Sequence, residues 1–250
     1  MIRAGRALLL ATLPLTLGLA ACGKKDAAAS GEVASSEPIA KVPAPAGQSW
    51  TETFSATPEG GYLMGNPNAP IKLVEFGALS CSHCAQFSKE GFPKLRDDYI
   101  ASGRVSYELR LFLLNALDMP AVLLATCGSP EAVIPLSEQF WEWQPNMFTN
   151  LQKDEAAFQQ IQNLPADKRF AGIAQLGGMS EFFASRGIAA AQGSSCLADS
   201  AKATKLATVN EQWSKEFDIT GTPTFFLNGS KTGVASWQEL EPMLQKAGAR

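Results

Sequence analysis

Two cysteines three positions apart, Cys81 and Cys84, enclose His83, the only histidine in the 250 residues. Such a pair can be half of a metal site, an inert bridge, or a disulfide that is made and broken as thiols exchange. A structural zinc site needs about four ligands, which this chain does not offer in a second pair. A bridge across so small a loop stabilises little, and a cysteine hydrolase needs a histidine base held across the site. The pattern therefore favours a redox pair, which needs no metal or organic cofactor because the cysteines carry the electrons.

The elements around the pair are expected to place Cys81 at the start of a helix. Residues 71–76 form an apolar run typical of a buried strand, and a helix with an interruption at residues 91–93 follows Cys84. Unpaired N–H groups and the helix dipole at a helix N-terminus favour a thiolate at Cys81. Cys84, one turn later, is expected to be more enclosed and to act as the resolving thiol, and His83 can add a positive charge or a hydrogen bond to the thiolate.

Two further residues are candidates for the same site. Glu75 lies in the middle of the apolar strand, six residues before Cys81. It is either an edge-strand carboxylate facing water or a buried acid with a raised pKa that exchanges a proton with Cys84. Pro223 directly precedes a strand predicted at residues 224–227, one of the few places where a sheet tolerates proline.

The order of the predicted elements indicates an α/β fold. Strand, helix and strand (residues 105–111) form a βαβ unit, and residues 224–246 read as strand, Asn-Gly turn, a returning strand over residues 231–235 and a helix over residues 237–246. Helical patterns fill the interval, including residues 119–127, 131–143, 154–164, 169–177 and 201–217. We therefore predict a thioredoxin fold from residues 50–114 and 201–250, with a helical insertion over residues 115–200.

The N-terminus is expected to be an export signal. Arg3 and Arg6 precede an apolar run over residues 7–19, which is too short to span a membrane but suits a secretory leader over residues 1–21. The small residues before Cys22 resemble the bacterial lipoprotein signal, in which Cys22 is lipidated and holds the protein on a membrane on the periplasmic side. Residues 23–49 are rich in Ala, Ser, Pro and Gly, so residues 22–49 are predicted to be a flexible tether.

The net charge and the cysteine count limit the binding partners and the disulfide pairings that we expect. The formal net charge is −3 and there is no basic cluster, so nucleic-acid binding is not expected. Apart from Cys22, four cysteines remain, and in an exported protein they can pair in three ways. Cys81 with Cys84 is the one local pair, which leaves Cys127 with Cys196 as a staple that closes a loop of about 70 residues.

Taken together, these residues resemble the DsbA-like branch of the thioredoxin superfamily. The resemblance rests on residues 64–70 leading into the strand, on Cys-Ser-His-Cys at 81–84, and on Gly-Thr-Pro-Thr at 221–224. It implies thiol–disulfide oxidoreductase activity on exported cysteine-containing proteins, a membrane partner that reoxidises the pair, and a cis-Pro223 that, with Thr222, holds substrate chain beside Cys81. It also implies that Glu75 is the family's buried acid and that Cys127–Cys196 is a second, non-catalytic disulfide.

The sequence departs from the family's strong oxidases at two positions. They carry proline where this chain has Ser82, and usually valine where it has Thr222. The dimeric isomerase branch has a residue like Thr222 but also an N-terminal dimerisation domain, for which residues 23–49 are too short. A monomeric oxidase is therefore expected, with a reductase or isomerase using the same pair, or a non-enzymatic binding module or chaperone, as the alternatives.

Overall fold

The structure is a computed structural model, and it describes residues 35–250. The predicted leader and Cys22 lie outside these residues. A single six-stranded sheet has the order β1-β2-β4-β3-β5-β6, in which β3 and β4 are parallel and every other neighbouring pair is antiparallel. The strands are β1 (Phe54–Ala56), β2 (Tyr62–Gly65), β3 (Ile71–Gly77), β4 (Val105–Leu111), β5 (Thr224–Leu227) and β6 (Ser230–Lys231).

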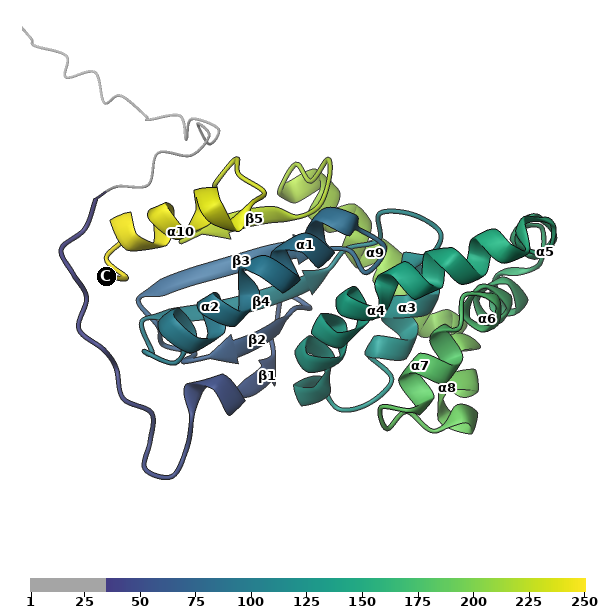
Figure 1. Cartoon of the computed structure of the whole chain (residues 1–250), viewed down its shortest axis with the longest axis horizontal. Coiled ribbons are helices and arrows are strands. Elements are labelled where there is room, and N and C mark those ends of the chain that lie inside the picture. The colour runs from purple at the N-terminus through teal and green to yellow at the C-terminus, as the bar shows by residue number, and fades with distance from the viewer. Residues whose placement is uncertain (1–34) are drawn as a thin grey trace, which may run out of the picture.

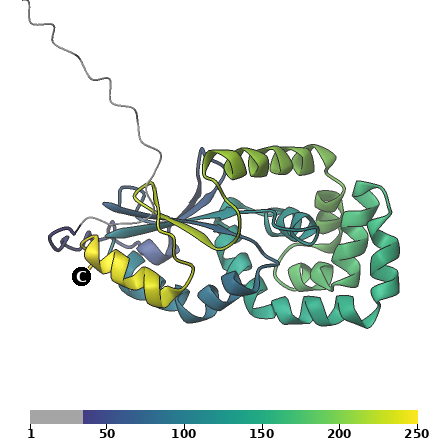
Figure 2. The ribbon, with the colours of Figure 1, turned by 90° about the horizontal axis from the view of Figure 1, so that it is seen from above.

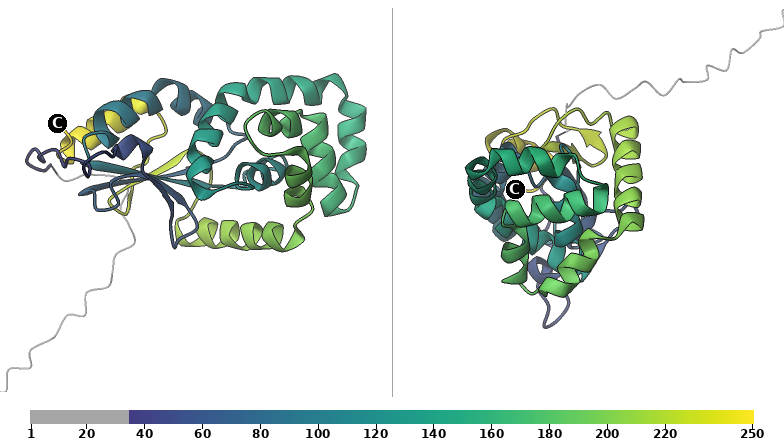
Figure 3. Two further views of the ribbon diagram at one scale, coloured as in Figure 1. Left: turned by 90° about the horizontal axis from the view of Figure 1, so that it is seen from below. Right: turned by 90° about the vertical axis from the view of Figure 1, so that its right-hand side faces the viewer.

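Helices cover both faces of this sheet (Figure 1). Figure 3 shows α9 (Ser200–Glu216) on one face and α1 (Ser82–Glu90) with α10 (Trp237–Lys246) on the other. Under α9, Phe76 of β3 packs edge-on against Trp213. On the opposite face the Phe87 ring of α1 packs 4.7 Å from the Phe225 ring of β5. Because side chains alternate along a strand, Glu75 points to the α1 face while Phe76 points to the α9 face.

The helical insertion lies beyond the end of the sheet at which β3 and β4 finish (Figure 2). Its helices are α3 (Asp118–Ala125), α4 (Val133–Lys153), α5 (Glu155–Gln162), α6 (Ala166–Leu176), α7 (Met179–Ala184) and α8 (Ala190–Leu197). Trp141 and Phe140 of α4 and Phe183 of α7 are among its fully buried side chains. The predicted thioredoxin fold with inserted helices is therefore confirmed.

Several element boundaries differ from the predictions. The strand expected over residues 231–235 is only the two-residue β6, and β1, β2 and α8 carried no signal strong enough to predict them. The helix expected to end at residue 143 continues through Pro145 to Lys153. Proline removes one helical hydrogen bond, but Met147 and Leu151 beyond it are buried, so tertiary packing outweighs the local preference.

The prediction of a flexible tether is wrong for its last part. Residues 36–49 run along the end of the sheet that lies away from the insertion (Figure 1). The Ile39 N–H donates to the Gly248 carbonyl at 2.9 Å, and the Val42 N–H donates to the Ser102 carbonyl at 2.9 Å. The Trp50 indole N–H donates to the Val42 carbonyl at 2.8 Å. These backbone bonds to distant parts of the chain cannot be read from composition, which is why the segment looked unstructured.

Within residues 35–250, no helix combines the length and the apolar character that crossing a membrane requires.

Candidate active site

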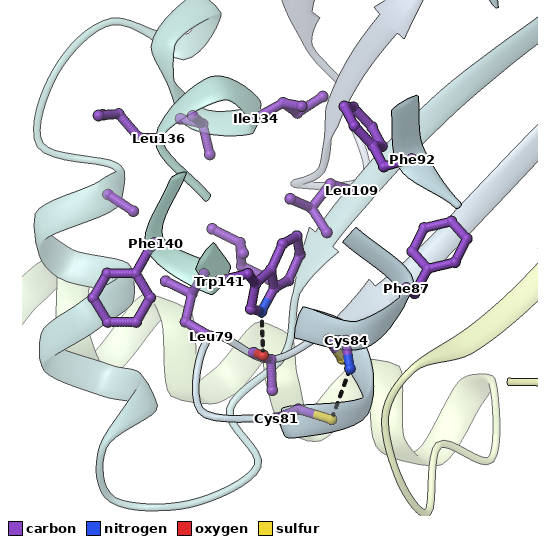
Figure 4. Close-up of a cluster of buried hydrophobic side chains, with 14 of the residues drawn as sticks. Leu79, Cys81, Cys84, Phe87, Phe92, Leu109, Ile134, Leu136, Phe140 and Trp141 are labelled. Carbon is purple, nitrogen blue, oxygen red and sulfur yellow. Dashed lines mark hydrogen bonds between the residues drawn. The ribbon is translucent and has the colours of Figure 1, made fainter. Parts of the chain in front are cut away.

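Cys81 lies at the junction between strand β3 and helix α1. β3 ends at Gly77, and after a three-residue loop Cys81 is the N-cap residue of α1, with its Sγ accepting a hydrogen bond from the Cys84 N–H at 3.4 Å (Figure 4). The sulfur thereby occupies the place where a helix start offers unpaired N–H groups and a partial positive charge. Cys81 keeps 6% of its surface exposed and Cys84 none, so only Cys81 can meet a large substrate.

The two thiols differ strongly in acidity. A hydrogen bond with the Cys84 thiol is the main reason that the pKa of Cys81 is lowered to about 5. The Thr222 side chain and the backbone N–H groups of Cys84 and His83 lower it further, and burial acts in the opposite direction. Burial raises the pKa of Cys84 well above its ordinary value, and Cys81 and Glu75 raise it further. At neutral pH Cys81 is therefore a thiolate nucleophile beside a protonated, enclosed partner, which is the asymmetry that thiol exchange requires.

The loop that enters β5 closes one side of Cys81. The Thr222–Pro223 peptide bond is cis, as the family resemblance implied. The Thr222 carbonyl oxygen lies 3.1 Å from Cys81 Sγ and accepts its hydrogen bond while the thiol is protonated. The structure thus brings the Thr222 carbonyl to the Cys81 sulfur from a point 141 positions away in the chain.

Glu75 is buried beneath the cysteine pair. β3 lies between β4 and β5, with Glu75 opposite Leu109 and Phe225, so the alternative of an edge-strand carboxylate facing water is wrong. Its side chain has no exposed surface. Oε2 accepts a hydrogen bond from the Tyr107 hydroxyl at 2.7 Å, and Oε1 has no hydrogen-bonding partner. Burial raises the pKa of Glu75 well above its ordinary range, so the carboxyl can hold a proton near neutral pH and exchange it with the neighbouring Cys84.

His83 acts on Cys81 through its backbone rather than its ring. Its N–H is one of the groups that lower the pKa of Cys81. The side chain is exposed and borders a small hollow shared with Trp237 of α10. Among the described residues its ring forms no hydrogen bond or ion pair, so the structure does not contain a hydrogen bond from the imidazole to Cys81. A contribution of the imidazole's positive charge stays a prediction.

Residues of the insertion hold the loop before Cys81, and no pattern in the sequence pointed to them. The Trp141 indole N–H donates to the Ala78 carbonyl at 2.9 Å (Figure 4). The Gln144 amide donates to the carbonyls of Leu79, at 2.6 Å, and Cys81, at 3.1 Å. Both side chains come from α4, one turn apart, and only the packing of α4 against α1 brings them here.

Asp118 holds the same loop from the start of α3. This buried carboxylate accepts hydrogen bonds from Ser80 N–H at 2.8 Å, from Ser80 Oγ at 2.9 Å, and from the N–H groups of Leu114 and Asn115, both at 2.9 Å. Burial raises the pKa of Asp118, although these hydrogen bonds act in the opposite direction. The sequence signal for this role was an acidic residue, Asp118, at the start of an otherwise apolar helix.

The other two cysteines of the described residues belong to the helical insertion. Cys127 and Cys196 form a disulfide that joins the end of α3 to α8, so the predicted pairing is confirmed. In the part of the chain that the structure covers, no three His, Cys, Asp or Glu side chains come together as metal ligands would.

The chain resembles known proteins over most of its folded part. A model of the thioredoxin family matches residues 57–246. A putative protein-disulfide oxidoreductase of Rickettsia conorii is 28% identical over 193 residues, which cover 74% of this chain and 59% of that protein. A protein of the same description from Rickettsia bellii is 26% identical over 200 residues, covering 78% of this chain and 69% of that protein. The chain thus spans about three fifths to two thirds of the length of these curated relatives.

Solved structures of proteins with the same fold also resemble this chain. The protein-disulfide isomerase of Novosphingobium aromaticivorans superposes with a TM-score of 0.70 at 29% identity, covering 73% of this chain and 94% of that one. Wolbachia pipientis alpha-DsbA1 superposes with a TM-score of 0.60 at 20% identity, covering 77% and 93%, and this likeness concerns the fold alone. The predicted resemblance to DsbA-like proteins of the thioredoxin fold is therefore confirmed.

Proposed function

The chain belongs to the thioredoxin family, and from that premise we propose that it is a thiol–disulfide oxidoreductase acting on cysteine-containing proteins through Cys81 and Cys84. The observation that carries the proposal is the unequal pair itself. A thiol with a pKa of about 5 caps a helix, and a fully buried thiol with a raised pKa lies one turn behind it. The relatives named as protein-disulfide oxidoreductases support the same reaction class.

In the oxidising direction the reaction has two exchanges. A substrate thiolate attacks Cys81 Sγ of the Cys81–Cys84 disulfide, the bond between the two protein sulfurs breaks, and its electron pair leaves on Cys84. Glu75 supplies the proton that Cys84, with its high pKa, requires. A second substrate thiolate then attacks the substrate sulfur of the mixed disulfide and releases Cys81 as a thiolate. The substrate has lost two electrons and the protein pair has gained them.

We favour the oxidase direction because the low pKa of Cys81 stabilises the reduced protein, and a stabilised reduced form makes the disulfide more oxidising. The isomerase alternative has its own support, since the Novosphingobium structure at 29% identity is that of a protein-disulfide isomerase. Equilibration with glutathione buffers tests the oxidase against a reductant: a potential of about −120 mV supports the oxidase, whereas one of about −270 mV refutes it in favour of a reductant. Rescue of a substrate with scrambled disulfides would instead support the isomerase.

The cellular setting is proposed from the N-terminal residues. We infer that residues 1–21 are removed on export, that lipid on Cys22 holds a monomer to a membrane on the periplasmic side, and that a membrane redox partner reoxidises the pair. Metabolic labelling with a radioactive fatty acid tests the anchor, because Cys22→Ser should abolish both the label and membrane association. Labelling that persists in this variant would contradict it.

Trapping the mixed disulfide tests the exchange mechanism. With Cys84→Ser, the mixed disulfide through Cys81 should accumulate, because the resolving thiol is missing; with Cys81→Ser, exchange should cease. Glu75→Gln keeps an acceptor for the Tyr107 hydroxyl but cannot release a proton, and should slow the wild-type reaction most at the step in which Cys84 leaves. Full activity of Cys81→Ser would leave a non-enzymatic binding module or chaperone as the function.

A further inference from the structure

A groove runs along α1 from the active site toward the sheet, between α1 and α4. It has a volume of about 740 Å³ and begins at Ser82, the residue after the attacking cysteine. Its floor includes the buried side chains of Ser88, Phe92 and Trp141. Figure 4 shows Trp141 lying between α4 and the helix that begins at Cys81. The groove therefore has an apolar floor and one end at Ser82, the residue next to Cys81.

Glu138 of α4 is the ionisable group at its inner wall. It also borders a second hollow of about 300 Å³ that continues from the groove toward β1 and β2. Its Oε2 accepts a hydrogen bond from Ser88 Oγ at 2.6 Å, whereas Oε1 is buried and has no hydrogen-bonding partner. A carboxyl oxygen without a donor is costly in a protein interior. The terminal torsion of a glutamate is soft, so either oxygen can turn toward a ligand.

The donor that fits this position is an ammonium group on an apolar stem. A lysine side chain can lay its methylene groups over the floor formed by Phe92 and Trp141 and place its charge at Glu138. The exposed border of the groove carries two acids, Glu90 and Glu142, and two bases, Lys89 and Arg96, of which Arg96 is paired with Asp97. The border charges therefore balance, and Glu138 is the group left to attract a cation.

The distance along α1 sets the register of such a substrate. Ser88 lies six residues beyond Ser82, which is about 9 Å along a helix. An extended chain covers that distance in about three residues. A substrate whose cysteine is bonded to Cys81 would therefore bring a side chain two to four residues away to Glu138.

We propose that this groove is a specificity site of the exchange reaction, and that Glu138 selects substrate segments carrying a lysine about three residues from the reacting cysteine. The inference rests on the proposed function, because the substrate is taken to be a protein thiol.

The charge of Glu138 gives the site a pH dependence. Burial raises the pKa of Glu138 to about 8, so the carboxyl ionises fully only above that pH or when a cation arrives. The titratable and charged groups that face it from the packed elements are Lys89 and Glu90 of α1, Arg96, Glu142 of α4, Glu75 of β3 and Tyr107 of β4. Lysine stays charged up to pH 10, so selection should strengthen between pH 6 and pH 9.

Matched peptides test the site. Each has a pair of cysteines and either lysine or norleucine, which lacks only the charged amine, three residues before the first cysteine or three residues after the second. The oxidised full chain is mixed with each peptide, and the second-order rate of peptide oxidation is measured at pH 6 and pH 9. At one of the two positions, lysine should be favoured over norleucine by about tenfold at pH 9, the worth of one charge-assisted hydrogen bond.

The ratio of the lysine rate to the norleucine rate is measured within each variant, so a change in that variant's basal rate cancels. Glu138→Gln should bring the ratio to one, whereas the matched control Glu142→Gln, one turn away on the exposed border, should keep it. Equal rates for lysine and norleucine at both positions would overturn the proposal, as would equal loss of the preference in both variants.

Binding separates the groove from the reaction. In peptides with serine in place of both cysteines, lysine should lower the Kd for the wild-type chain by a similar factor. This holds even if the chain proves unable to oxidise any peptide, an outcome that would refute only the proposed oxidase. Following the Glu138 carboxyl by NMR in the wild type, the lysine peptide should lower its pKa, and an unchanged titration would count against the site.

Discussion

The acidity of Cys81 gives the sharpest test of the site, because its main cause is one removable group. The Cys84 thiol is the largest of four hydrogen-bonding groups that together take the pKa of Cys81 from 9.0 to about 5. Since burial opposes them, the four strengthen the acid by at least about 10⁴-fold, and the largest contributes at least about tenfold. Replacing Cys84 with alanine should therefore weaken the acid by tenfold or more.

The assay is the rate of alkylation of reduced Cys81 by iodoacetamide as a function of pH, read at the peptide that contains Cys81 by mass spectrometry. In the wild type the rate should reach half its maximum near pH 5, and in Cys84→Ala at pH 6 or higher, because only the thiolate reacts. Cys84→Ser keeps a hydroxyl donor at the same place and is the matched control, with a midpoint between the two.

Two results would refute this reasoning. A wild-type midpoint near pH 8.5 would mean that the helix start and its hydrogen bonds do not stabilise the thiolate. A Cys84→Ala midpoint equal to that of the wild type would mean that the helix N-terminus alone is responsible and that the buried thiol has no part in it.

Three further predictions concern stability, each read by urea unfolding. Glu138 ionises near pH 4.5 when unfolded and near pH 8 when folded, so the folded state keeps a proton that the unfolded chain releases. The stability of the wild type relative to Glu138→Gln should therefore fall by about 5 kcal/mol as pH rises from 4.5 to 8, because the slopes from other groups, Cys81 among them, are shared by both proteins and cancel in the difference. Replacing Cys127 and Cys196 with alanine, which opens a loop closed across 69 positions, should cost about 4 kcal/mol; a loss below 1 kcal/mol would contradict the loop argument. Asp118→Ala leaves the buried Ser80 donors unpaired and should cost about 3 kcal/mol or more, so an unchanged midpoint would show that water replaces them.

Much of the fold followed from local pattern. Val105 to Leu111 alternates apolar and other residues and forms β4 with those bounds, and the final helix begins at Trp237 and ends at Lys246 as predicted. Elements that depend on tertiary contacts could not be predicted from local sequence pattern. β1 has three residues and exists because it pairs with β2, and α4 continues past Pro145 because its buried side chains hold it.

The sequence by itself identified the two cysteines that we propose as the reacting pair. Cys81 and Cys84 are three apart at a strand–helix junction, and that spacing together with the chemistry of a helix start is enough to distinguish an attacking thiol from a resolving one. Glu75 could be named as a candidate, but its two interpretations differed only in burial. The packing of β3 between β4 and β5 decided between them.

Tertiary structure alone decided which side chains of the helical insertion reach the site. Gln144 holds the loop before Cys81, and Glu138 borders the groove beside α1. Both side chains are polar and unremarkable in their own segment. Their roles arise because hydrogen bonds and charges act over a few ångströms in space, whereas sequence pattern records only neighbours along the chain.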